Sequence, residues 1–148
     1  MRTNTPHTAP AVIRPDGSEA KKAVREARRM VSDVLDECHR SGCEAAGSRA
    51  DDVLLVVSEL VTNACRHAGG ADEVRVRLQQ GELVVEVEDA SDVLPEEPAD
   101  EAKGESGGYG CQLVTALSDH WGVVPRDGSD QSAEGAGGKT VYAGFALT

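Results

Sequence analysis

The stretch SELVTNACRHAGG, from Ser58 to Gly70, constrains the chain most, because read as a helix it has two different faces. Helical spacing places Val53, Val57, Leu60 and Ala64 in one apolar stripe, which is typical of a helix that packs on a core. A second face collects polar side chains at i, i+3, i+4 and i+7, namely Glu59, Thr62, Asn63 and Arg66. This face is either the solvated side of an ordinary helix or one wall of a site.

The polar face carries groups that suit a site. The Glu59 carboxylate can accept a proton or orient a water molecule, and the Asn63 carboxamide oxygen can ligate a hard cation such as Mg²⁺. Arg66 and His67 lie one turn beyond Asn63. We expect His67 to be structural rather than catalytic, because a lone histidine usually has a local partner.

Two later segments favour a site over a solvated face. The run LVVEVED alternates apolar and polar residues from Leu83 and ends on Asp89, which predicts a strand with a carboxylate at its end. Further along, the glycine-rich turn 107–110 leads into the predicted helix CQLVTAL. Glycines before a helix let a phosphate approach the backbone amides at the helix N-terminus.

These three segments, SELVTNACRHA, VEVEDAS and GGYGCQLVTALSDHWGV, resemble the N, G1 and G2 boxes of the GHKL (histidine kinase-like) ATPase superfamily. The match is closest to bacterial anti-sigma-factor serine/threonine kinases and to small single-domain ATP-binding regulators. It extends from about Ala20 to the C-terminus. The resemblance implies the Bergerat fold, an α+β two-layer α/β sandwich with a mixed, mostly antiparallel sheet and helices on one face.

The resemblance also implies a role for each motif residue. Glu59 would be the general base, Asn63 the Mg²⁺ ligand, and Asp89 the acceptor for the adenine amino group. Asp89→Asn should therefore weaken nucleotide binding and leave the melting temperature of the empty protein nearly unchanged. Thr140 would lie near the adenine. The full set of residues expected to bind ATP or ADP is Asn63, Arg66, Asp89, Gly107, Gly108, Tyr109, Gly110 and Thr140.

The sequence departs from the family pattern at two places. Ala90-Ser91 follows Asp89 where many members have a glycine at the third position, and Cys111 stands where a leucine is usual. We expect Cys111 to be a packing residue. The four cysteines show no CxxC spacing, which indicates reduced thiols rather than a zinc site.

The net charge of −11 argues against nonspecific binding to nucleic acid or to an anionic membrane. ATP is also an anion, so a site for it needs Mg²⁺, backbone amides and a few cations, for which Arg66, Lys103 and Lys139 are the candidates. The sequence shows neither a long apolar run nor an N-terminal signal pattern, which leads us to expect a cytoplasmic protein.

Outside the motifs, we expect a flexible N-terminal segment, 1–15, with a short edge strand at its end, followed by one ATPase domain, 16–148. An apolar stripe predicts a first helix from Ala20 to Cys38, and its basic outer face is usually solvated, although the family uses this region for dimers or partners. Residues 42–47 read as a loop, and Ser48 to Asp51 as a capping box that opens the second helix. Acidic residues 92–106 would form the ATP lid. We expect further strands at 74–79, 121–125 and 140–147, with Gln80-Gly81 as the turn of an antiparallel hairpin to the Leu83 strand and a polar hairpin loop at 126–138. The Gly69-Gly70 pair should end the second helix.

Two functions stay open. The first is an ATP-dependent serine/threonine kinase that regulates transcription by binding a sigma factor and phosphorylating an anti-anti-sigma (STAS-type) partner. The second is a non-catalytic ATP/ADP-binding module that regulates its partner through nucleotide-dependent conformation. Retention of Glu59 favours the first. A purely structural protein would leave the ordered motifs unexplained.

Overall fold

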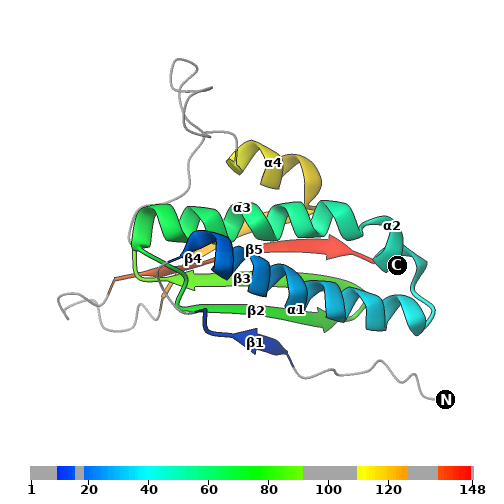
Figure 1. The fold of residues 1–148 in the computed structure, drawn as a ribbon. Helices are drawn as coiled ribbons and strands as arrows, with labels where there is room; N and C mark the ends of the chain where they lie inside the picture. Colours follow the sequence, from blue (N-terminus) through cyan, green and yellow to red (C-terminus); the bar gives the residue numbers. More distant parts are fainter. Residues whose placement is uncertain (1–9, 16–18, 92–109, 127–136, 148) are drawn as a thin grey trace.

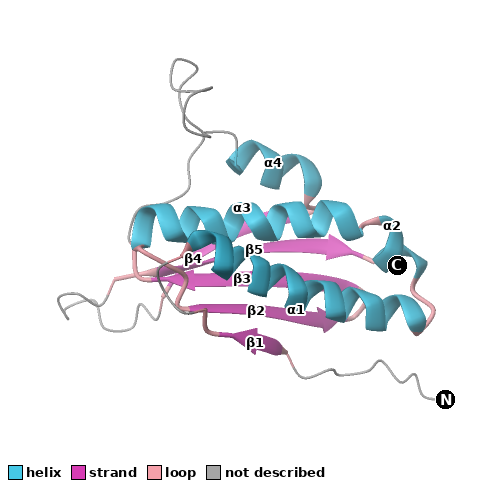
Figure 2. Cartoon of the chain, in the orientation of Figure 1, coloured by secondary structure: helices cyan, strands magenta, loops and turns pink. Residues whose placement is uncertain are grey.

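A five-stranded antiparallel sheet carries helices on one face (Figures 1 and 2). The computed structural model describes residues 10–15, 19–91, 110–126 and 137–147. Its elements, in chain order, are β1 (Ala11–Ile13), α1 (Ala20–Arg40), α2 (Glu44–Ser48), α3 (Ala50–Ala68), β2 (Glu73–Gln79), β3 (Glu82–Asp89), α4 (Gly110–Leu117), β4 (His120–Pro125) and β5 (Lys139–Ala146). The predicted α+β two-layer fold is confirmed.

The two long helices form because their apolar residues recur at helical spacing. In α1 the buried residues Ala23, Ala27, Val31 and Leu35 follow one another at intervals of four. In α3 the predicted stripe is buried, together with Val56 and Val61. Figure 1 shows α3 over the middle of the sheet, with α1 on the side of β1 and β2 and α4 on the opposite side.

The ends of α3 show one predicted and one unpredicted feature. Gly69 ends the helix in the left-handed conformation (φ 77°), as the Gly-Gly pair indicated. At the start, the expected capping box does not form, because Arg49 occupies the N-cap and no side chain caps the helix there. The Arg49 guanidinium instead donates to Asp119 (2.9 Å) and to the carbonyls of Leu117 (3.0 Å) and Ala146 (3.1 Å). The loop expected at 42–47 contains the short helix α2.

The strands run in the order β1-β2-β3-β5-β4, and each of their four pairings is antiparallel. A mixed sheet would need a parallel pairing, and the described strands contain none. The predicted hairpin joins β2 to β3, and its turn residues Gln80 (φ 54°) and Gly81 (φ 79°) both have positive φ. Residues 11–13 of the expected flexible N-terminal segment pair with β2 as an edge strand.

Alternation along the strands divides the sheet into two faces. One face packs on the helices with residues such as Leu83, Val85 and Phe145, which are fully buried. The other face carries an ion-pair network in which Arg75 contacts Glu73, Glu86 and Glu88. The site described below lies on the helix-covered face.

Candidate functional site

A buried ion pair marks the end of β3. Asp89 and Lys139 are direct cross-strand partners, and they are only 2% and 5% exposed. The Lys139 ammonium donates to both carboxylate oxygens of Asp89, at 2.9 and 3.1 Å, and to the Ser91 carbonyl at 3.3 Å. Of the residues that the structure describes, these are the only charged ones that are buried. Removing either residue would leave the other as an uncompensated buried charge, so each requires the other.

Helix α3 forms the other wall of this site. Leu60, Asn63, Ala64 and His67, at i, i+3, i+4 and i+7, line a cavity of about 20 Å³ together with Asp89, Lys139 and Val141. The structure therefore brings Asn63 and Asp89, predicted from separate motifs, to the same cavity. His67, which we expected to be structural, lines it as well.

The other predicted residues of α3 lie next to the cavity without lining it. Glu59 is half-buried one turn before Asn63, and Arg66 is exposed one turn after it. The positively charged side chain that lines the cavity is Lys139 of β5, which bonds to Asp89.

Thr140 was expected near the adenine, and this role stays a prediction. Alternation along β5 buries Lys139 and Val141 on the helix-covered face. Thr140 falls between them and is the cross-strand partner of Glu88. Thr140 and Glu88 therefore lie on the face of the sheet opposite Asp89. Lys139, considered from the sequence only as a cation that offsets the charge of ATP, occupies the place beside Asp89.

Arg126 holds the backbone around the ion pair. It forms ion pairs with Asp72 (2.8 Å) and Glu88 (2.6 Å), and it donates to the Asp89 carbonyl (3.3 Å). Its own N–H bonds to the Gly138 carbonyl at 3.0 Å. Gly138 has φ 124°, and a Cβ there would lie 2.7 Å from the Asp89 carbonyl oxygen, so glycine is required. Residues 126–138 were expected to form a hairpin loop without a function. The glycine before Lys139 was the one feature of the sequence that could have indicated a special backbone conformation here.

Several predicted residues lie outside the described part of the chain. They are Gly107, Gly108 and Tyr109 of the turn, residues 92–106 of the expected lid, and Lys103. Gly110 is described as the first residue of α4. The expected roles of these residues in nucleotide binding stay predictions.

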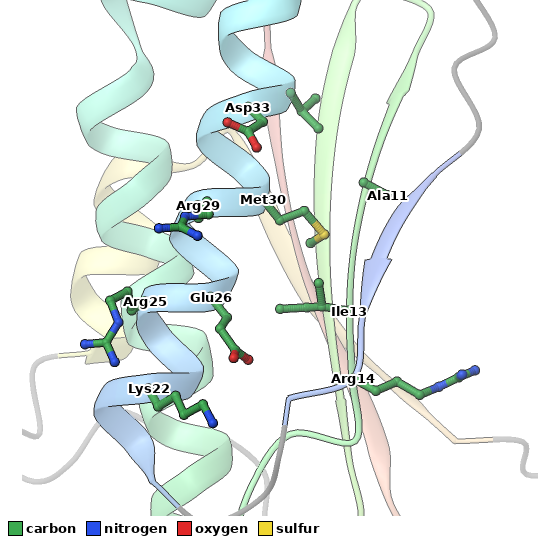
Figure 3. Close-up of a pocket in the computed structure, with 10 residues that line it drawn as sticks. Ala11, Ile13, Arg14, Lys22, Arg25, Glu26, Arg29, Met30 and Asp33 are labelled. Carbon is green, nitrogen blue, oxygen red and sulfur yellow. The ribbon is translucent and has the colours of Figure 1, made fainter.

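A larger cavity lies elsewhere in the described structure. It is a groove of about 820 Å³ between α1 and β1, where Met30 and Ile13 point toward each other and Lys22 and Glu26 extend from α1 toward β1 (Figure 3). None of the predicted nucleotide-binding residues lines it. Size alone therefore does not identify the site, whereas the motif residues converge on the small cavity.

Comparison with known proteins agrees with this convergence. The model of a family described as the histidine kinase-like ATPase domain matches residues 18–140. The chain belongs to this family. A search of curated proteins gave no match.

Among solved structures, the chain is similar to one in the crystal structure of the SiaB–SiaC complex from Pseudomonas aeruginosa. The TM-score is 0.59 at 14% sequence identity, over 91% of this chain and 88% of that one. This likeness shows a shared fold. Among the described helices, none is both long and apolar enough to cross a membrane.

Proposed function

We propose that this domain is an ATP-binding regulatory protein that acts on a protein partner. One observation carries the proposal: in a histidine kinase-like ATPase domain, Asn63 of α3 and Asp89 of β3 line the same cavity. The carboxylate oxygens of Asp89 are acceptors for a base amino group, and the carboxamide oxygen of Asn63 is a ligand type that Mg²⁺ accepts.

The oxygen atoms of Asn63 and Asp89 at this cavity are of the types that bind Mg²⁺ and a nucleotide base. Of the described residues, no group of three or more His, Cys, Asp or Glu side chains could hold a metal. Mg²⁺ typically takes one or two protein ligands and completes its shell with water and phosphate oxygens, so the Asn63 oxygen at the cavity can serve as its protein ligand. When bound, Mg²⁺ would neutralise charge on the phosphates. Asn63 would hold it, and the amides of the 107–110 turn would bind phosphate oxygens.

For the function of the bound state, we favour a protein serine/threonine kinase of the anti-sigma-factor type. Glu59 lies one turn before Asn63 on α3, so its carboxylate is near the end of the site that Asn63 would define. In this role Glu59 accepts the proton of a serine hydroxyl on an anti-anti-sigma partner. The fold shared with a chain of a two-protein complex supports a protein partner. The second candidate is a nucleotide-dependent binding module without phosphoryl transfer.

The test begins with a pull-down, in which the immobilised protein recovers its partner from an extract of the native cell, once with ATP and once with ADP. Transfer of labelled phosphate to the purified partner is then measured for wild type, Glu59→Gln and the control Glu37→Gln. Glu37 lies on the exposed surface of α1 and pairs with Arg40. Loss of a positioned base lowers the rate by about 10²-fold or more. We expect that loss for Glu59→Gln only, with ATP affinity unchanged within a few-fold.

Equal transfer by wild type and Glu59→Gln would remove Glu59 from the mechanism. No transfer by wild type to a partner whose binding depends on the nucleotide would favour the module.

A further inference from the structure

Most of the hydrogen-bonding capacity of the Asp89–Lys139 pair is used within the protein. An ammonium has three N–H donors, and those of Lys139 meet three acceptors, the two Asp89 carboxylate oxygens and the Ser91 carbonyl. The ammonium bonds to both carboxylate oxygens and the Ser91 backbone N–H donates to Oδ1 at 2.8 Å, so about three of the four acceptor positions of the carboxylate are taken. The cavity beside them, about 20 Å³, has room for about one water molecule. A purine base does not fit in this conformation.

We propose that Lys139 is an internal competitor for the nucleotide base and sets the nucleotide affinity of the pocket. This inference rests on the proposed function and deepens it. A base that approaches Asp89 through this cavity meets the Lys139 ammonium, which also lines the cavity, and competes with it for the carboxylate. Hydrogen bonds between two charged groups are stronger than those from a neutral amino group, so the competitor favours the closed pocket.

The surrounding backbone confines the opening of the pocket to one side chain. Arg126 bonds to the Asp89 carbonyl on one strand and to the Gly138 carbonyl on the other, so it holds both strand ends. Lysine has a flexible four-carbon chain, which lets its ammonium leave without moving the strand. The measured dissociation constant is then the intrinsic constant divided by the fraction of molecules whose pocket is open.

Lys139→Met tests the competitor, because methionine keeps a similar length and apolar stem but cannot donate a hydrogen bond. Calorimetric titration of the full chain with ATP and Mg²⁺ compares it with wild type. We expect ATP to bind at least about tenfold tighter, equal to about 1.4 kcal/mol. The control Lys22→Met, on the exposed face of α1, should bind within about twofold of wild type.

A second variant, Lys139→Gln, keeps a hydrogen-bond donor without the charge and should show a smaller gain. It also serves if Lys139→Met does not fold. In the Asp89→Asn background the Lys139→Met gain should disappear, because the competition requires the carboxylate.

If wild type binds ATP and neither folded Lys139 variant binds it more tightly, Lys139 is not a competitor and the proposed function still stands. Binding by a Lys139 variant but not by wild type would support the competitor. If wild type and both variants fail to bind ATP, the competitor and the proposed function are both overturned.

Discussion

Asp89 and Lys139 depend on each other, since each is a buried charge whose partner is the other. Removing one member of a buried ion pair leaves an uncompensated charge and typically costs about 3–5 kcal/mol. We therefore expect Asp89→Asn to lower the free energy of unfolding of the empty protein by about 3 kcal/mol, measured by urea denaturation. This replaces the expectation, drawn from the sequence, that the melting temperature would hardly change.

The matched control for that measurement is Asp36→Asn, because Asp36 lies on the exposed face of α1. An exposed substitution of this kind changes stability by less than about 0.5 kcal/mol. Equal stability of Asp89→Asn and wild type would show that the ion pair contributes nothing in solution.

Cys38, near the end of α1, is a second residue whose environment makes a prediction. Burial, with a hydrogen bond to Cys43, raises the pKa of its thiol to about 11. Only the thiolate reacts with iodoacetamide, so at pH near 8 the Cys38 thiolate is about a hundredfold scarcer than that of an ordinary cysteine. Mass spectrometry of timed alkylation should show Cys38 reacting correspondingly more slowly than a cysteine in a short peptide. Comparable rates would contradict the raised pKa.

At the scale of residues, the sequence predicted what depends on local spacing. Asn63 follows Glu59 by one helical turn, and Asp89 ends an alternating strand, so both could be recognised without the fold. That Lys139 rather than Thr140 stands beside Asp89 could not be predicted from local spacing. It depends on which β5 residue stands opposite Asp89, and that register is set by contacts between strands far apart in the chain.

At the scale of elements, the solvent-facing side of the sheet is held by cross-strand ion pairs. Burial alone would raise the pKa of Glu86, but hydrogen bonds from Arg75 (2.9 Å) and Arg77 (2.9 Å) outweigh it and lower that pKa. A lowered folded-state pKa gives stability that is present above the unfolded pKa and is lost as the pH falls through the folded one.

Glu86→Gln should therefore be less stable than wild type at neutral pH, by about 1 kcal/mol. The difference should shrink once the pH falls below the ordinary range of a glutamate, because the wild-type carboxyl is then also neutral. Urea denaturation across that range measures it. Glu37→Gln is the control, since Glu37 forms an exposed pair with Arg40. A difference that stays constant as the pH falls would contradict the role of the charge.

Periodicity was enough to predict α1, α3 and the β2–β3 hairpin, because each is encoded by a continuous segment. The start of α3 was not predictable in the same way. Arg49 bonds there to Asp119 and Ala146, which lie 70 and 97 residues further along the chain. Tertiary contacts of this range override a local capping pattern, and α2 is likewise a short turn of helix with no strong periodic signal.

At the scale of the whole molecule, the two layers create the site. Helix α3 lies over β3 and β5, so Asn63 of α3 and Asp89 of β3 line the same cavity between the two layers. The chain carries a net charge of −11, which opposes the binding of an anion. Nucleotide binding in such a protein should therefore depend strongly on Mg²⁺.

Calorimetric titration of the full chain with ATP, in Mg²⁺ and again in excess chelator, tests the central claim most directly. We predict saturable binding in Mg²⁺ that weakens at least about tenfold in chelator, a loss of about 1.4 kcal/mol. Asn63→Ala should weaken binding in Mg²⁺ to a similar extent and respond less to chelator, because it lacks the proposed ligand. No heat of binding at millimolar ATP with Mg²⁺ present, in wild type and in Lys139→Met alike, would contradict the account.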